Sequence, residues 1–228
     1  RAYLAQGIQT KLDFHFLTGD VYHDLEVGVR YHKDSEDRFK WNDSYAMIDG
    51  SMVLTTAGTP GTQTNQIAYA EAVAMHALYK LKYKDLTITP GIRFETIDLE
   101  NNNYGTNDPD RIGNTLTNIN NHVKVWLPGF GANYRINNDL SFFGGVHKGF
   151  APPTLSPNNT NAIAEKSINY ELGSRFKHNK LSGEIVAYFN DYSNLLGSDL
   201  AASGGSGTLD QFNAGEAHVK GIEFLINY

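Results

Sequence analysis

Residues 79–89 read Tyr79-Lys80-Leu81-Lys82-Tyr83-Lys84-Asp85-Leu86-Thr87-Ile88-Thr89, and they show the pattern from which the fold is predicted. Apolar and polar side chains alternate on both sides of the pair Lys84-Asp85. A period of two places successive side chains on opposite faces of a β-strand, and two such runs joined by two residues are typical of a β-hairpin. The stretch therefore predicts two antiparallel strands joined by a tight turn.

The same alternation recurs along the whole chain. In residues 21–34, Leu25 and Val27 lie on one predicted face, and Glu26, Gly28 and Arg30 on the other. We predict nine strands, over 3–16, 21–34, 66–83, 86–100, 121–135, 140–150, 163–177, 181–193 and 215–228.

Two of these segments fit the pattern less well. Residues 70–78 are rich in strong helix formers and could form an amphipathic helix. Alternation from Val73 to Tyr83, followed by the turn at Lys84-Asp85, favours a strand there. Residues 126–130, Trp126-Leu127-Pro128-Gly129-Phe130, do not alternate, so the faces of the strand over 121–135 stay unassigned.

The connections between these strands alternate in length. Four are short, Leu17-Thr18-Gly19-Asp20, Lys84-Asp85, Asn137-Asn138-Asp139 and His178-Asn179-Lys180, and four are long, 35–65, 101–120, 151–162 and 194–214. Short and long connections follow each other without exception. Outer-membrane barrels have this topology, with short periplasmic turns and long extracellular loops.

Composition and patterning agree with a membrane barrel. No run of about 18 apolar residues exists, as a transmembrane helix would need, but a barrel strand exposes only every second side chain to lipid. Counting from the short turns, the apolar face ends after about ten residues, where Glu71 and Asp98 appear, as expected for a strand leaving the bilayer. Tyr83, Tyr134 and Tyr228 lie near the short-turn ends, where an aromatic girdle is expected.

Other classes of function find little support. The chain has 228 residues, a net charge of -6 and no cysteine, which disfavours nucleic acid as a partner and excludes thiolate metal sites and disulfides. The eight histidines show no metal-ligand spacing. No nucleophile motif such as Gly-x-Ser-x-Gly occurs, so we expect no catalytic residues and no intrinsic cofactor.

Several blocks resemble TonB-dependent outer-membrane receptors. Residues 145–153, Gly145-Val146-His147-Lys148-Gly149-Phe150-Ala151-Pro152-Pro153, resemble a strand end of that family. The block Glu165-Lys166-Ser167-Ile168-Asn169-Tyr170-Glu171-Leu172-Gly173 is similar to the one that follows it, and 188–196 and 219–224 resemble the next two strands. Upstream, 91–95 and 127–129 are similar to residues at matching places in the family. The blocks span about 90–228, whereas residues 1–89 are merely compatible with the family.

The resemblance implies an all-β, antiparallel up-and-down transmembrane barrel of 22 strands. Residues 1–228 would form about nine strands of it, without the remaining strands, the N-terminal plug domain or the TonB box. An open nine-strand sheet would leave unpaired backbone groups in lipid, which independently indicates a fragment. The implied location is the outer membrane of a Gram-negative bacterium.

The resemblance also implies active uptake of a large, scarce ligand. The implied partners are the TonB-ExbB-ExbD complex, acting through the missing plug region, and the lipid of the outer membrane. The resemblance favours a ferric siderophore or ferric citrate as ligand, with iron carried as part of the substrate. Haem is disfavoured because no histidine lies between Phe150 and Glu165, and Asn161-Ala162-Ile163-Ala164 replaces the expected Asn-Pro block.

Two groups of candidate site residues follow from this interpretation. Ligand contacts are expected from arginine, lysine and aromatic residues of the long loops, because arginine pairs well with carboxylates; these are Arg38, Lys40, Trp41, Tyr45, Tyr104 and Arg111. Lumen-facing charges either line a solvated barrel or hold the plug; these are Arg30, Arg93, Glu95, Glu171, Arg175, Glu184 and Glu223. A passive porin and a soluble or surface β-domain for adhesion stay open as alternatives.

Overall fold

The computed structural model describes residues 1–153, 155, 163–198, 211–213 and 215–228. Nine strands form one sheet: β1 (Ala2–Thr18), β2 (Val21–Lys40), β5 (Thr64–Tyr83), β6 (Leu86–Asn103), β7 (Thr117–Arg135), β8 (Leu140–Ala151), β9 (Glu165–His178), β10 (Leu181–Ser193) and β13 (Ala217–Asn227). Two small hairpins complete the described part: β3 (Ser44–Ile48) with β4 (Ser51–Thr56), and β11 (Leu196–Ser198) with β12 (Gln211–Asn213).

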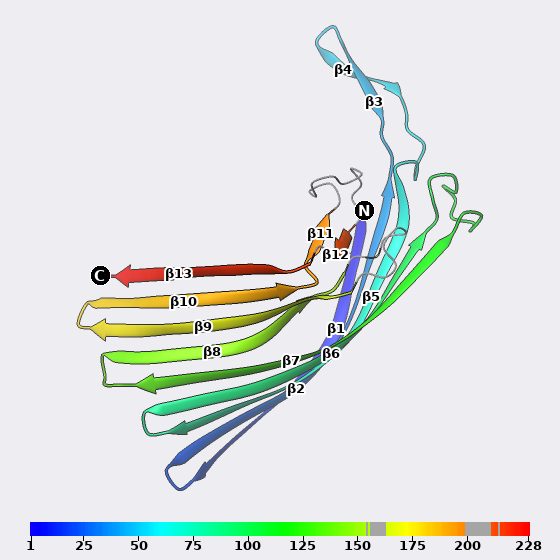
Figure 1. The fold of residues 1–228 in the computed structure, drawn as a ribbon. Helices are drawn as coiled ribbons and strands as arrows, with labels where there is room; N and C mark the ends of the chain where they lie inside the picture. The colour runs from blue at the N-terminus through cyan, green and yellow to red at the C-terminus, as the bar shows by residue number, and fades with distance from the viewer. Residues whose placement is uncertain (154, 156–162, 199–210, 214) are drawn as a thin grey trace.

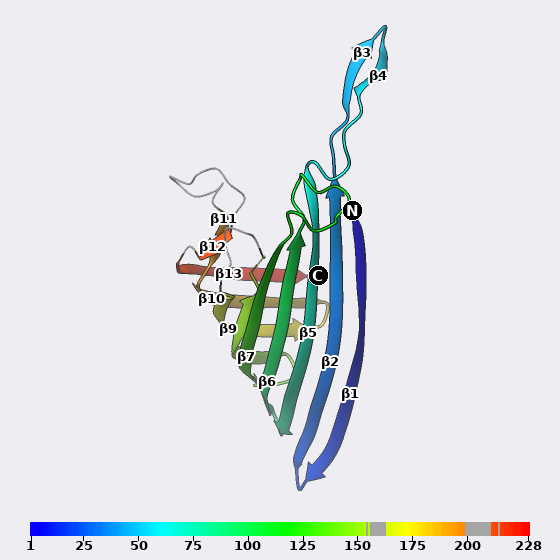
Figure 2. The same ribbon diagram turned by 90° about the vertical axis from the view of Figure 1, so that its right-hand side faces the viewer.

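The large sheet follows chain order, β1-β2-β5-β6-β7-β8-β9-β10-β13, and every neighbouring pair is antiparallel. Figures 1 and 2 show it as a curved, strongly twisted wall, with the four short turns at one end and the long connections at the other. This confirms the all-β, up-and-down prediction. Residues 70–78 lie within β5, so the strand interpretation of that segment is confirmed as well.

Register divides the side chains between two faces, because residues paired across an antiparallel ladder share a face. One face, here called the outer face, carries Val27, Ala77, Ile92 and Pro128, which occupy one row from β2 to β7. The opposite, inner face carries Arg30 and Glu95. Apolar residues face lipid in a transmembrane barrel, and polar residues line its interior.

The pairing of β6 with β7 assigns the faces that the sequence left open. Trp126 pairs with Phe94 and Phe130 with Pro90, so both aromatic side chains lie on the outer face. Leu127 pairs with Arg93 on the inner face. Alternation was obscured because apolar residues occupy both faces of β7: Val123 and Val125 are buried on the inner face in a cluster with Ile97 and Ala164.

A charged residue ends the apolar outer face on eight of the nine strands. We call these residues the charged belt: Lys33, Glu71, Asp98, Lys124, Lys148, Lys166, Asp191 and Lys220. Each follows about 7–12 residues counted from the short-turn end of its strand, which is close to the length of a tilted strand crossing an apolar band about 25 Å tall.

Several strand ends and the first long connection differ from the sequence prediction. β2 continues to Lys40 and β5 begins at Thr64, so Arg38 and Lys40 belong to a strand and not to the predicted loop over 35–65. The rest of that connection contains the hairpin β3–β4, which projects beyond the sheet in Figures 1 and 2. The predicted strands ended too early because polar side chains interrupt the alternation of apolar and polar residues before the backbone pairing ends.

The connections 151–162 and 194–214 lie partly outside the described residues, including 161–162 of the block compared with haem receptors. No helix in the described part of the chain is long and apolar enough to cross a membrane.

Candidate ligand-facing surface

A hollow of about 370 Å³ lies at the long-loop end of the inner face. It is formed by β1, β2, β5 and β6 and closed on one side by Pro153 and Leu155 of the next long connection. The Asn101 side-chain amide donates to the Leu155 carbonyl over 3.3 Å and so holds this connection against the sheet. The polar residues that line the hollow are Tyr3, Asp34, Ser35, Glu36, Arg38, Gln66, Tyr69, Glu100 and Asn101.

Two arginines surround one carboxylate in this hollow. The Arg38 Nε atom lies 2.8 Å from Glu36 Oε1, and Arg1 contacts the same carboxylate. The Arg38 guanidinium beside Glu36, helped by Tyr3 and Arg1, lowers the pKa of Glu36 to about 2. The trio therefore carries a net positive charge at neutral pH, with Arg38 about one third exposed.

A second hollow, of about 350 Å³, lies farther along the inner face between β8, β9 and β10. Its polar lining includes His147, Glu165, Asn169, Glu171 and Asn190. Asn169 donates to Ser167 Oγ over 3.1 Å. Within the described residues, no group of three or more potential ligands is arranged to hold a metal ion.

The β6–β7 connection is fastened to the outer side of β2 by Arg111. Its guanidinium donates to both Asp37 oxygens, over 3.0 and 2.6 Å, and to Asn65 Oδ1 over 2.7 Å. It also lies 4.8 Å from the ring centre of Phe39 and 5.5 Å from that of Tyr104. Arg111 beside Asp37 lowers the pKa of that carboxyl group. Asp37 in turn raises the pKa of Arg111.

Asp108 and Asn65 organise the same connection from within. The Asp108 carboxylate accepts the backbone N–H groups of Ile112 and Gly113 over 3.0 and 2.7 Å. The buried Asn65 side chain donates to the carbonyls of Gly105 and Asp108 over 3.1 and 2.6 Å. The Asn65 contacts join residues 40 and 43 positions apart, so no local sequence pattern indicated them.

The predicted ligand residues fall into three places. Arg38 lines the inner hollow, and Lys40 is the exposed last residue of β2. Trp41 and Tyr45 lie at the base of the projecting hairpin and are 43% and 51% exposed. Tyr104 and Arg111 contact each other in the fastened connection, so the structure brings together only part of the predicted set.

The predicted lumen-facing charges all share the inner face. Arg93 pairs with Glu95 over 2.8 Å, Arg175 contacts Glu184, and the Arg175 guanidinium lies 4.0 Å from the Phe143 ring centre. Arg30 Nη2 lies 3.3 Å from His32 Nδ1. Glu171 lines the second hollow, and Glu223 pairs with Val186 on the same face.

Sequence reasoning missed one inner-face network. Lys11 Nζ lies 2.8 Å from Glu26 Oε2, and His76 Nε2 lies 3.0 Å from the other oxygen of Glu26. A side chain at Gly28 would collide with His76, since a Cβ there would lie 2.3 Å from His76 Cε1. The alternation of β2 placed Glu26 and Gly28 inward but could not indicate which residues they meet.

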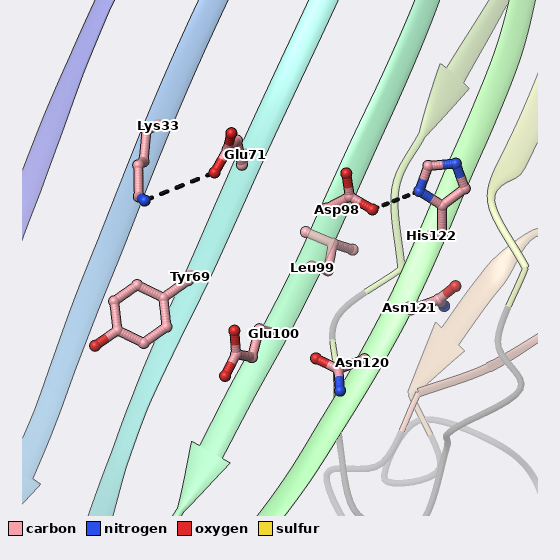
Figure 3. A pocket seen from close by; sticks show the side chains of 9 residues that line it. All are labelled: Lys33, Tyr69, Glu71, Asp98, Leu99, Glu100, Asn120, Asn121 and His122. Atoms are coloured by element: carbon pink, nitrogen blue, oxygen red, sulfur yellow. Dashed lines mark hydrogen bonds and ion pairs between the residues drawn. The ribbon is translucent and has the colours of Figure 1, made fainter.

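A larger hollow, of about 550 Å³, lies on the outer face at the level of the charged belt. Figure 3 shows Lys33 and Glu71, whose charged atoms are 3.6 Å apart, beside the hydrogen bond between Asp98 and His122. Because most of its polar side chains point away from the barrel interior, we do not assign this hollow to ligand capture.

The sequence matches one protein family over nearly its full length. Residues 2–228 match the family described as TonB dependent receptor-like, beta-barrel. Among curated proteins, the ferrienterobactin receptor of Escherichia coli (strain K12) is 23% identical over 199 residues, which cover 75% of this chain and 24% of the receptor. The chain thus spans about a quarter of this relative's length.

Solved structures show the same fold. The unliganded ferric citrate transporter FecA superposes with a TM-score of 0.75 and 21% identity, covering 98% of this chain and 32% of FecA. The siderophore receptor PiuA from Acinetobacter baumannii gives 0.75 and 15% over 98% of this chain and 36% of PiuA. The copper transporter OprC gives 0.64 and 11% over 97% of this chain and 34% of OprC.

Proposed function

Because this chain belongs to the TonB-dependent receptor β-barrel family, whose members are non-enzymatic transporters of the Gram-negative outer membrane, we propose that it forms part of the barrel wall of a receptor that imports a ferric chelate. The proposed ligand is a ferric siderophore or ferric citrate. Energy would come from the TonB-ExbB-ExbD complex through a plug domain that lies outside residues 1–228.

The inner hollow around Arg38 is the observation that carries this proposal. It opens at the long-loop end of the sheet, where a ligand would arrive from outside the cell. Arginine forms forked, charge-assisted hydrogen bonds with carboxylates, which ferric citrate and many chelates present. Lys40, Trp41 and Tyr45 stand beyond the hollow and would make the first contacts. The names of the ferrienterobactin receptor and of FecA support an iron chelate, and OprC makes copper the alternative cargo.

The inner-face charges would hold the plug. Arg30, Arg93 and Glu171 face the space that a plug would occupy, and Glu95, Arg175, Glu184 and Glu223 share that face. Several already pair with one another, as Arg93 does with Glu95. We propose that the charges without such partners make the plug contacts.

A growth and binding assay on the full-length receptor tests the proposal. The receptor is expressed in a strain lacking its other iron receptors, which is starved of iron and supplied in turn with ferric citrate, a ferric catecholate, a ferric hydroxamate or a copper chelate. We expect growth with one iron chelate, and its loss when TonB is removed. We expect Arg38→Ala to weaken binding of that chelate about tenfold, equivalent to one charge-assisted hydrogen bond.

Arg135→Ala provides the matched control, since Arg135 pairs with Asp85 at the short-turn end, far from the hollow. Growth that persists without TonB would show passive diffusion and contradict the proposal. So would uptake of copper but of no iron chelate.

A further inference from the structure

An apolar hollow of about 430 Å³ interrupts the outer face at Gly144 on β8. Gly144 pairs with Ala132 on β7 and with Leu172 on β9, so two of three adjacent outer-face positions carry small or no side chains. The surrounding wall is aromatic and aliphatic; it includes Phe130, Tyr134, Phe142, Val146 and Leu172. The hollow lies within the segment that crosses the membrane.

Lysines of the charged belt lie just beyond this hollow. Lys148 is on the same strand and face as Gly144, four residues on, or about 13 Å along the strand. Lys166 pairs with Phe150 and is therefore a diagonal neighbour of Lys148. Lys220 on β13 pairs with Phe189 on β10, and Phe189 pairs with Tyr170 on β9. Lys220 therefore lies two strands away from Lys166. All three lysines are exposed.

Among the described residues, these lysines share with Lys124 of the belt the lack of a carboxylate partner, whereas Lys33 has one. On β2, Lys33 is 3.6 Å from Glu71, and Asp98 pairs with His122. Among the described residues, no carboxylate lies within ion-pair distance of Lys148, Lys166 or Lys220. Asp191, the acidic group between them, is 3.2 Å from His218. This part of the belt therefore presents excess positive charge where the apolar face ends.

We propose that the Gly144 hollow and Lys148, Lys166 and Lys220 form a binding site for a phosphate-bearing lipid of the outer leaflet. One acyl chain lies in the hollow, and the lipid phosphates contact the lysines. The apolar hollow and the charges are separated along the strand as the chains and headgroup of a lipid are. The site is continuous with the lipid-facing surface, which favours lipid over a protein partner.

Native mass spectrometry of the full-length receptor in detergent tests this site. The probes are lipid A with two phosphates, the same lipid without phosphate, and phosphatidylcholine. We expect bound bis-phosphorylated lipid A on the wild type and much less of the other two. A lysine near an anionic membrane surface contributes about fivefold in binding, so Lys148→Gln, Lys166→Gln and Lys220→Gln together should weaken binding about 100-fold.

Two further variants separate the headgroup and chain contacts. Lys33→Gln removes a belt lysine that already has a carboxylate partner, and we expect it to bind lipid A as the wild type does. Gly144→Leu fills the hollow and should weaken binding with all lysines present. Heat-modifiable gel migration verifies that each variant is a folded barrel.

Equal binding of phosphorylated and dephosphorylated lipid by the wild type would overturn the proposal. Unchanged affinity in the folded triple-lysine variant would do the same. Neither result depends on which chelate the receptor imports.

Discussion

At the scale of single residues, Arg111 joins parts of the long-loop end that lie far apart in the sequence, since it contacts Asp37, 74 positions away. Its guanidinium donates hydrogen bonds to Asp37 and Asn65 and lies over the rings of Phe39 and Tyr104. Lysine keeps the charge but cannot donate to two oxygens of one carboxylate in a fixed fork. The ligand contact predicted from sequence for Arg111 would require it to leave these partners or to act while bound to them.

We therefore predict that Arg111→Lys releases the β6–β7 connection without unfolding the barrel. Loss of one charge-assisted hydrogen bond corresponds to about tenfold in an equilibrium constant, so amide exchange in residues 104–116 should accelerate about tenfold. Hydrogen-exchange mass spectrometry measures it. Arg135→Lys, at the exposed pair with Asp85, is the control and should leave these residues unchanged. Unaltered exchange in Arg111→Lys would show that the connection is held by other contacts.

Glu36 should make the upper end of β1 and β2 sensitive to acid. Its pKa is lowered from 4.5 to about 2 by Arg38, Tyr3 and Arg1. A carboxyl group whose folded-state pKa is lowered stabilises the fold fully above its unfolded-state pKa, and this contribution is lost as pH falls through the folded value.

The expected signature is a pH-dependent difference between the wild type and Glu36→Gln. Amides at the start of β1 should exchange faster in the variant above pH 5, and the difference should shrink between pH 4.5 and about 2. Hydrogen exchange, corrected for the intrinsic pH dependence of the amides, measures this. A difference that grows towards low pH would contradict the assigned cause.

Residue faces were predictable from sequence wherever alternation was clean. Glu171 and Arg175 were predicted to face inward because Tyr170 and Leu172 alternate with them, and the register puts both charged residues on the face opposite Leu172. Contacts across strands were not predictable, because Arg111 and Asp37 are 74 positions apart and nothing local joins them. The hollow around Arg38 depends on Leu155 and Asn101, which the alternation of β2 cannot indicate.

At the scale of elements, the sequence predicted all nine strands of the sheet but misplaced several ends. The predicted 21–34 is β2, which runs to Lys40, and 121–135 is β7, which begins at Thr117. Alternation of hydrophobicity reports where a strand faces lipid, while backbone pairing continues above the membrane among polar residues such as Asn118 and Asn120. The hairpin β3–β4 was missed for the same reason, since it has no lipid-facing side.

The hairpin β3–β4 should be dispensable for folding. Its apolar side chains are unusually open, with Met47 and Met52 72% and 70% exposed. Replacing residues 44–56 by a short Gly-Ser connection removes few contacts with the sheet and changes loop-closure entropy only slightly. We expect the melting temperature of the full-length receptor to change by no more than about 2 °C and heat-modifiable migration to persist. A receptor that no longer folds would show that the hairpin supports the barrel.

At the scale of the whole molecule, the sheet is open. β1 and β13 each pair with one neighbour only, β2 and β10 respectively, within the described residues. Their free edges present unpaired N–H and C=O groups, and each such group costs several kcal/mol in the apolar part of a bilayer. The solved relatives extend well beyond the matched part, since this chain covers 32% of FecA and 36% of PiuA.

The open edges lead to a prediction about folding of the isolated chain. Residues 1–228 alone, mixed with lipid vesicles from denaturant, should fail to give a monomeric, protease-resistant and heat-modifiable barrel, because two strand edges would remain unpaired in lipid. The full-length receptor, treated in the same way, should insert and show all three properties. Closure by self-association is the other route to satisfied edges, so cross-linking must accompany the gel assay. A monomeric, inserted form of residues 1–228 would show that β1 and β13 can pair with each other, and the wall would then be a small closed barrel.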